Sequence, residues 1–264
     1  MDLQLTDKMA VVTGSTAGIG LAIATLLAQE GASVVVNGRS QQRVDEAVSR
    51  IQMENTNAKL TGVVADLGTK RGVEVLTNKV ARTDILVNNL GIYEPKPFAE
   101  ITDEDWLKFF EVNVLSGARL SRFYLPKMLN NNWGRIVFIS SESGLNIPVE
   151  MIHYGVTKTA QIALARGLAE MTAGTHVTVN SVLPGPTRSE GVEQFVKDMA
   201  KAQGTDAANV ETEFFKSVRP SSLLKRFATP EEVAAMVVYA CSPRASATNG
   251  AALRVEGGVV RSIV

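Results

Sequence analysis

Tyr154 and Lys158 are the two residues whose types and spacing most directly suggest chemistry. Residues four positions apart share one face of a helix, so the phenol and the ammonium can point into one site. A free phenol has a pKa of about 10 and is a poor acid–base catalyst at neutral pH, and a fixed ammonium nearby would lower that pKa. A pKa near 7 would need roughly 4 kcal/mol of differential stabilisation. Since most such pairs are an amphipathic tyrosine and a solvated lysine, the rest of the chain must decide between the two interpretations.

A glycine-rich loop near the N-terminus suggests a second part of the same site. The stretch from Thr13 to Gly20 places Gly14, Gly18 and Gly20 between an expected strand and an expected helix. Glycines there allow a sharp turn and a close approach to a pyrophosphate, whose charge the helix N-terminus stabilises. The structural alternative is a tight turn with close packing of helix on sheet. In the first strand–helix unit, this pattern favours a dinucleotide site.

Short apolar runs alternate with helical patterns along nearly the whole chain. Strands buried on both faces are expected at Ala10–Thr13, Ser33–Val36, Gly62–Ala65, Ile85–Val87, Arg135–Ile139, Val177–Val182 and Ala251–Val255. Helices are expected at Ile19–Glu30, Gln41–Met53, Asp103–Leu129, Glu150–Met171 and Pro230–Cys241. This alternation predicts an α/β fold with a single doubly wound, Rossmann-type sheet of about seven mainly parallel strands.

Composition limits the classes of partner and cofactor. The 264 residues carry 27 basic and 27 acidic side chains, so nothing favours a nucleic-acid partner. Cys241 is the only cysteine, and no cluster has the spacing of metal ligands, so we expect no disulfide and no bound metal. The N-terminus lacks the pattern of a secretory signal, and no apolar run approaches about 20 residues. We therefore expect a cytoplasmic protein that does not enter a membrane.

One long segment interrupts the alternation of strands and helices. Residues 187–228 lie between an expected strand and the next confident helix, and a long insertion in a compact domain is more often functional than a plain connection. We predict a substrate-binding lid. Its apolar face suggests a fairly hydrophobic substrate, or instead packing against the core or another subunit. That face contains Phe195, Phe214, Phe215, Leu223 and Leu224.

The glycine spacing Gly-x-x-x-Gly-x-Gly, together with Tyr-x-x-x-Lys, resembles the short-chain dehydrogenase/reductase family over essentially the whole chain. Asn88-Asn89-Leu90-Gly91 is similar to the family's Asn-Asn-Ala-Gly motif, with leucine in place of alanine. Further matches are Asp66-Leu67, Pro184-Gly185 and Glu256-Gly257-Gly258. The resemblance implies one catalytic NAD(P)-binding domain over residues 1–264. It also implies a homotetramer that pairs the long helices and the C-terminal strand.

The resemblance also implies roles for four residues. Ser141 lies thirteen residues before Tyr154, and Asn113 lies 28 residues before Ser141, as the family pattern expects. Tyr154 would exchange a proton with the substrate oxygen, and Ser141 would donate a hydrogen bond to that oxygen. Lys158 would lower the pKa of the tyrosine and hold the nicotinamide ribose, while Asn113 would anchor a water. The implied nucleotide contacts are Gly14, Ser15, Thr16, Gly18, Ile19, Gly20, Arg39, Ser40, Asp66, Leu67, Asn89, Gly91, Tyr154, Lys158, Pro184, Gly185 and Thr187.

The end of the second expected strand bears on the choice of nucleotide. An acidic residue there would bind the ribose 2′-hydroxyl of NAD and repel a 2′-phosphate, but Gly38 occupies that position. Arg39 offers a planar cation suited to a phosphate, and Ser40 offers a hydroxyl. Ala17 stands where many NADP-dependent relatives carry a basic residue. We therefore favour NADP(H), with NAD(H) as the alternative.

Three functions remain open at this stage. The first is an NADPH-dependent reductase that transfers hydride between nicotinamide and a small carbonyl or secondary alcohol. The second is a relative such as a 3-oxoacyl-carrier-protein reductase, for which Arg219, Lys225 and Arg226 would form a basic docking patch. The third is a non-catalytic dinucleotide-binding sensor. Glu142 follows Ser141 and could line the substrate cleft, but we expect it to be a solvated loop carboxylate.

Overall fold

The computed structural model describes residues 1–263, without the side chains of Phe195 and Gln203, so the predicted place of Phe195 in an apolar face lies outside the described residues. Its centre is a seven-stranded sheet in the order 3-2-1-4-5-6-7, and every neighbouring pair is parallel. The strands are β1 Met9–Val12, β2 Ser33–Gly38, β3 Lys59–Val64, β4 Ile85–Asn88, β5 Gly134–Ile139, β6 Val177–Pro184 and β7 Ala252–Val255. The predicted doubly wound sheet is confirmed.

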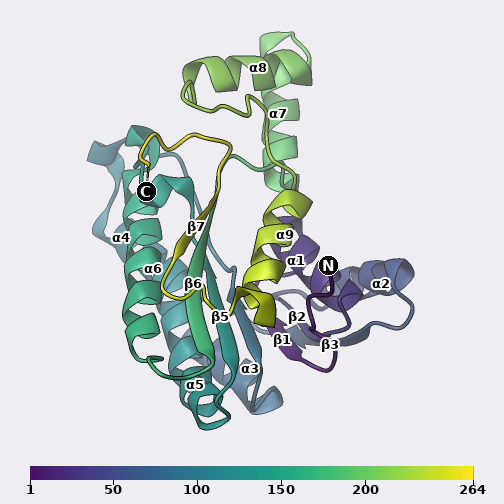
Figure 1. Cartoon of the computed structure of the whole chain (residues 1–264). Coiled ribbons are helices and arrows are strands. Elements are labelled where there is room, and N and C mark those ends of the chain that lie inside the picture. Colours follow the sequence, from purple (N-terminus) through teal and green to yellow (C-terminus); the bar gives the residue numbers. More distant parts are fainter. Residues whose placement is uncertain (264) are drawn as a thin grey trace.

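Helices cover both faces of this sheet (Figure 1). Successive residues of a strand point to opposite faces, so Ala10 and Val12 of β1 join one core, whereas Val11 joins the other. The first core is covered by α1 Gly18–Gln29, α2 Gln41–Glu54 and α9 Pro230–Cys241. The second is covered by α3 Lys70–Lys79, α5 Ser116–Asn130 and α6 Ile152–Glu170.

The predicted continuous helix Asp103–Leu129 is divided in the structure. Helix α4 spans Asp103–Phe110, a π-helical turn spans Glu111–Leu115, and α5 follows. Single π turns inside helices often occur at functional sites. This one contains Asn113, whose position is described below.

The predicted insertion leaves and rejoins the fold at neighbouring points. Thr187 and Ala228 pair in a short parallel bridge, so the two ends of residues 187–228 meet. Between them lie α7 Glu190–Gln203 and α8 Ala207–Ser217, which extend beyond the carboxyl ends of the strands in Figure 1. Within residues 1–263, no helix is both long enough and apolar enough to cross a membrane.

Candidate active site

The glycine loop has the backbone that its sequence predicts. Gly14 and Gly18 adopt φ values of 59° and 53°, which side chains with a Cβ rarely adopt. A Cβ on Gly20 would lie 2.4 Å from the Gly14 carbonyl oxygen, so glycine is also needed there for packing. Helix α1 begins after Ala17 without a side-chain cap. Its first N–H groups are therefore suited to bind a phosphate, and this loop fits the pyrophosphate of a dinucleotide.

The side chains of Ser15, Asn37 and Asn89 fix the glycine loop by hydrogen bonds to its backbone and to the adjoining strands. The Ser15 hydroxyl is fully buried, donates to the Val12 carbonyl at 2.7 Å and accepts from the Asn37 amide at 2.9 Å. The Asn37 side-chain oxygen accepts from the Gly14 amide at 3.2 Å. Asn89 donates to the carbonyls of Thr13 and Gly14, each at 3.0 Å. This role of Asn37 was not predicted, although a polar residue near the end of an apolar strand is a signal that the sequence contains.

The end of β2 has no room for an acidic side chain unless a neighbouring residue moves. A Cβ on Gly38 would lie 2.5 Å from Cγ2 of Thr16, so an Asp or Glu there would displace this threonine. Arg39 and Ser40 are exposed at the start of α2. Among residues 1–263, Arg39 has no ion-pair partner, so its guanidinium is available to a phosphate.

The remaining predicted nucleotide contacts occupy the carboxyl edge of the sheet. Asp66 is exposed after β3, whereas Leu67 is buried in the core. Pro184 ends β6, and a Cβ on Gly185 would lie 2.7 Å from the backbone of Glu256, so packing requires glycine at that position. The Thr187 hydroxyl donates to the Gly185 carbonyl at 2.9 Å.

Tyr154 and Lys158 lie on one face of α6, as their spacing predicts. The Lys158 amine is 5.5 Å from the centroid of the Tyr154 ring and donates to the Ile139 carbonyl at 2.9 Å. Burial lowers the pKa of Lys158 to about 7. Burial also raises the pKa of Tyr154 above its ordinary value, and a hydrogen bond with Ser141 opposes that rise only in part.

The direction of the tyrosine pKa differs from the expectation stated above. Removing a phenolate from water costs free energy, and here that cost outweighs the stabilisation by neighbouring groups. The same desolvation disfavours the ammonium of Lys158, which weakens its effect on the phenol. In this state Tyr154 is a neutral phenol at neutral pH, so it is ready to donate a proton.

Ser141 and Ser140 point in different directions at the end of β5. The Ser140 hydroxyl donates to the Lys158 carbonyl at 2.7 Å, so it fixes α6 against the sheet. Ser141 instead hydrogen-bonds toward Tyr154 and Glu142. The geometry therefore brings together Ser141, Tyr154 and Lys158, beside Gly91, where a Cβ would be 3.3 Å from the Lys158 amine.

Asn113 is fully buried in the π turn between α4 and α5. Its side-chain oxygen accepts from the Ile92 amide at 2.7 Å, and its amide group donates to the Ile92 carbonyl at 3.0 Å and to the Thr157 hydroxyl at 2.9 Å. Gln161 donates to its backbone carbonyl at 2.6 Å. The side chain of Asn113 thus ties the loop after β4 to α6. Its backbone carbonyl and its side-chain oxygen each have a second lone pair that could accept from a water.

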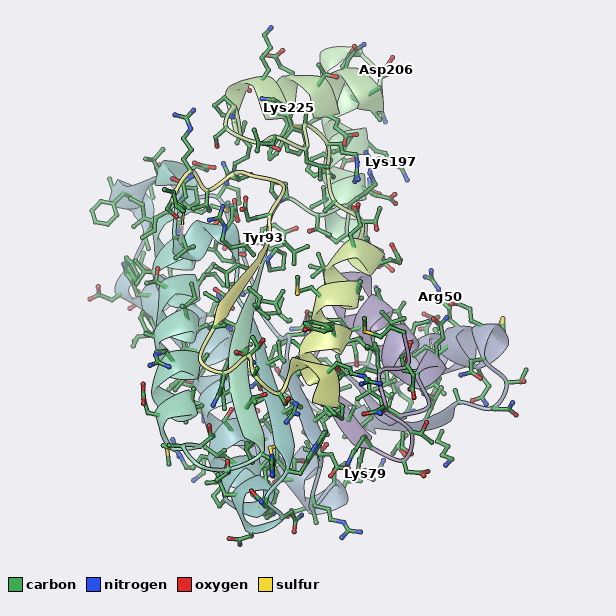
Figure 2. The ribbon with its side chains drawn as sticks, viewed as in Figure 1. Arg50, Lys79, Tyr93, Lys197, Asp206 and Lys225 are labelled. Atoms are coloured by element: carbon green, nitrogen blue, oxygen red, sulfur yellow. The ribbon has the colours of Figure 1, made fainter. Side chains whose placement is uncertain are left out.

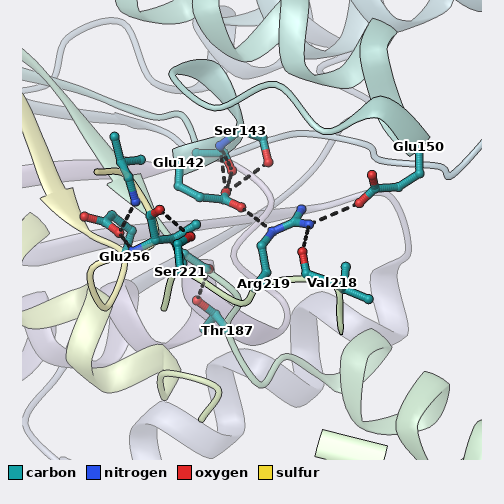
Figure 3. A network of polar contacts seen from close by, with 12 residues as sticks. Glu142, Ser143, Glu150, Thr187, Val218, Arg219, Ser221 and Glu256 are labelled. Carbon is teal, nitrogen blue, oxygen red and sulfur yellow. Dashed lines mark hydrogen bonds and ion pairs between the residues drawn. The ribbon is translucent and has the colours of Figure 1, made fainter. Parts of the chain in front are cut away.

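A buried ion-pair network lies directly beside Ser141 and was not predicted (Figure 3). Glu142, expected to be solvated, has a side chain only 5% exposed and pairs with Arg219, Nε to Oε1, at 3.1 Å. Arg219 also donates to Glu150 at 3.1 Å. Because Arg219 belongs to the insertion, 77 residues from Glu142, sequence spacing gave no sign of this pairing.

The predicted basic docking patch is not assembled in this structure. Arg219 is buried between its two carboxylates. Arg226 forms a two-pronged pair with Glu232 at 2.8 and 2.9 Å. The Lys225 amine donates to the Pro220 carbonyl at 2.8 Å, near the exposed rim of the insertion (Figure 2). This arrangement leaves little unpaired positive charge for an acidic partner.

The apolar face predicted for the insertion is divided: Phe214 and Phe215 pack within the insertion, whereas Leu223 and Leu224 are 83% and 37% exposed. Phe215 is buried against Val196, Val210 and Phe227, with Phe214 beside them, so these rings form a small core of their own. They do not form an apolar wall for a substrate. This finding supports the packing alternative over the hydrophobic-substrate alternative for this cluster.

Comparisons with known proteins agree with this geometry. The family model for short chain dehydrogenases matches residues 8–200. The chain belongs to the short-chain dehydrogenase/reductase family, and it is an oxidoreductase that acts on CH–OH and C=O groups.

Three relatives cover almost the whole chain. It is 50% identical to the uncharacterized oxidoreductase YvrD of Bacillus subtilis, with all of both chains covered. It is 35% identical to the 3-oxoacyl-[acyl-carrier-protein] reductase FabG of Aquifex aeolicus, over 98% of this chain and 100% of that one. The L-sorbose reductase of Gluconobacter frateurii, solved with NADPH and L-sorbose, is 32% identical, with a TM-score of 0.92 and full coverage of both chains.

Proposed function

We propose that the protein is an NADP(H)-preferring oxidoreductase that transfers hydride between nicotinamide and a small carbonyl compound or secondary alcohol. The observation that carries this proposal is the convergence of Ser141, Tyr154 and Lys158 at the edge of the sheet that holds the glycine loop. The similar L-sorbose reductase, which was solved with NADPH, supports the choice of nucleotide. The unpaired Arg39 beside Gly38 supports it independently.

In this proposal each residue of the site has a separate role in the hydride and proton transfers. Bound NADPH would supply the hydride. Tyr154 is held neutral by burial and would protonate the oxygen of the reduced carbonyl, while Ser141 would donate a hydrogen bond to the same oxygen. The Lys158 amine, with its pKa lowered to about 7, would orient the nicotinamide ribose and assist proton return to Tyr154. Asn113 would maintain the loop after β4 and, through its carbonyl, hold a water.

We further propose that residues 187–228 act as the substrate-binding lid of one catalytic domain. Their ends meet at Thr187 and Ala228, and Arg219 reaches from this segment to the catalytic serine's neighbour. A homotetramer and a cytoplasmic location are predictions that accompany this proposal. Cell fractionation would test the location.

The proposal is tested by turnover. Purified protein should oxidise NADPH with at least one member of a panel of small ketones and aldehydes, at a higher kcat/KM than with NADH. Tyr154→Phe should lower kcat by about a hundredfold or more, because the general acid is lost, while the affinity for NADPH stays within a few-fold. Nicotinamide absorbance gives the rate, and nucleotide fluorescence gives the affinity.

The same panel separates the other two functions. An acetoacetyl thioester turned over much faster than free ketones would favour the 3-oxoacyl-carrier-protein reductase, which the 35% identity to FabG keeps in consideration. Tight NADPH binding without turnover of any carbonyl or alcohol would favour the non-catalytic sensor. Full activity of Tyr154→Phe would refute the role of the tyrosine.

A further inference from the structure

The carboxylate of Glu142 occupies the position beside the hydroxyl of Ser141. Its Oε2 accepts from the Ser141 hydroxyl at 2.5 Å and from the Ser143 amide and hydroxyl at 2.7 and 3.0 Å. Its Oε1 accepts from Nε of Arg219 at 3.1 Å (Figure 3). Four donors therefore hold a buried carboxylate next to the group that would contact the substrate oxygen.

The charge of this network is not balanced. Arg219 is the only cation in it, and it donates to both Glu142 and Glu150, so the three side chains carry a formal charge of minus one. Its Nη1 also donates to the Val218 carbonyl at 3.0 Å. A negatively charged substrate would bring another anion close to this partly desolvated network, and the repulsion would disfavour its binding.

The hydroxyl of Ser141 has only one proton to donate, and in this structure it is donated within the Glu142 network. A serine hydroxyl donates one hydrogen bond, and here that bond goes to Glu142. When Ser141 donates to a substrate carbonyl instead, the buried Oε2 of Glu142 loses one of its donors. Oε2 then keeps the two donors of Ser143, and a substrate donor in the position that Ser141 vacates would restore a third, charge-assisted hydrogen bond. Because Oε2 lies 2.5 Å from the Ser141 oxygen, the nearest substrate group that could supply this donor is a hydroxyl on the carbon next to the carbonyl.

We propose that the substrate is an uncharged carbonyl compound with a hydroxyl on the adjacent carbon, and that Glu142 binds this hydroxyl. The inference rests on the proposed function and defines its substrate class. In the reduction, hydride from NADPH adds to the carbonyl carbon, the C=O π bond breaks, and its oxygen takes the proton of Tyr154. The products are a vicinal diol and NADP⁺, and solvent returns one proton to the tyrosine.

The first experiment compares three four-carbon substrates with the wild-type protein and NADPH. They are 1-hydroxybutan-2-one, which has the adjacent hydroxyl, butan-2-one, which lacks it, and 2-oxobutanoate, which carries a negative charge. We expect kcat/KM for the hydroxyketone to exceed that for each of the others by about tenfold to a hundredfold, because only it replaces the lost donor without adding charge.

The second experiment removes the carboxylate. In Glu142→Ala, the ratio of kcat/KM for 1-hydroxybutan-2-one to that for butan-2-one should fall toward one, mainly through a higher KM for the hydroxyketone. Using a ratio cancels any general damage to Ser141. The matched control is Glu74→Ala, which removes an exposed carboxylate of α3 far from the insertion and should keep the wild-type ratio and rates.

The outcomes distinguish this inference from the function on which it rests. Equal use of butan-2-one and the hydroxyketone by the wild type would overturn the inference alone, and so would an unchanged ratio in Glu142→Ala. Preference for 2-oxobutanoate would overturn it as well. No turnover of any carbonyl or diol would refute the proposed function and the inference together. The wild-type comparison remains decisive even where Glu142→Ala does not fold.

Discussion

At the scale of single residues, burial determines the protonation of the two groups that the sequence singles out. Tyr154 and Lys158 are each more stable in the neutral form here than in water. A buried lysine without a carboxylate partner lowers the free energy of unfolding. Its presence beside Tyr154 therefore favours a functional reason over a structural one.

Lys158→Met should stabilise the protein and inactivate it. Because the pKa of Lys158 falls to about 7 in the folded state, the unfolded chain binds more protons between pH 7 and about 10.5. This residue therefore lowers stability most near and below pH 7, and its penalty fades as pH rises toward 10.5. We expect Lys158→Met to raise the free energy of unfolding at pH 7 by about 2 kcal/mol or more.

Urea unfolding of both proteins at pH 7 and pH 9.5 would measure this difference. The gain from the substitution should shrink at the higher pH, since removing the proton from the lysine on folding costs less free energy as the pH approaches 10.5. Lys127→Met, at a partly exposed lysine of α5, serves as the control. A loss of stability at pH 7 in Lys158→Met would contradict the argument.

Arg39→Asp should reverse the nucleotide preference. The substitution removes a planar cation and adds an anion beside the expected 2′-phosphate, so KM for NADPH should rise by about tenfold to a hundredfold. KM for NADH should change little, since NADH lacks that phosphate. Arg82→Asp makes the same charge change at an exposed site before β4 and should leave both values unaltered. Unchanged NADPH kinetics in Arg39→Asp would remove Arg39 from the nucleotide site.

At the scale of elements, the sequence predicted those helix boundaries that depend on interactions between residues close together in the chain. Helix α9 begins at Pro230, as expected, because Thr229 and Glu232 form a capping box that four adjacent residues encode. Helix α3 was missed: it carries few apolar residues and contains Gly72, which lies against the Asp66 carbonyl, where a Cβ would be 1.9 Å away.

The parts of the site that were not predicted depend on contacts between distant elements. The π turn at Asn113 is accompanied by hydrogen bonds from Ile92 and Gln161, and neither is a neighbour in sequence. The burial of Glu142 depends on Arg219, which the insertion supplies. Motif spacing places Tyr154 and Lys158 on one helix face, but it does not report the desolvation that sets their pKa values.

Gly20→Ala tests the glycine loop as an element. Its Cβ would lie 2.4 Å from the Gly14 carbonyl oxygen and 2.5 Å from the Asn89 side-chain nitrogen, so the loop must move. We expect a loss of about 1–3 kcal/mol of stability and at least a tenfold weaker affinity for NADPH. Thermal unfolding and a fluorescence titration would measure the two effects.

Gly167→Ala is the matched control for this substitution. Gly167 lies in the last turn of α6, and a Cβ there would meet nothing within 4 Å. Replacing glycine by alanine in a helix should stabilise the protein by about 0.5–1 kcal/mol and leave nucleotide affinity unaltered. A normal affinity for NADPH in Gly20→Ala would contradict the role assigned to the loop.

At the scale of the whole molecule, two surfaces remain suited to a second copy of the chain. Within residues 1–263, strand β7 lies at the end of the sheet beside β6, so its outer edge is open to pairing with another strand. Leu107 of α4 and Leu115 of the π turn are 72% and 38% exposed, on the long helical segment that the predicted tetramer would pair. Symmetric association would cover both surfaces.

Sedimentation velocity of the purified 28.3 kDa chain should therefore give a species of about four times that mass. The double substitution Leu107→Glu and Leu115→Glu places charges on the helical surface, so it should shift the protein toward dimers or monomers, because burying an unpaired carboxylate is costly. Met53→Glu changes an apolar side chain of α2 that is 81% exposed, away from both surfaces, and should leave the tetramer intact. A monomeric wild type at micromolar concentration would refute the predicted assembly, and an unaltered tetramer in the double variant would exclude this helical surface from it.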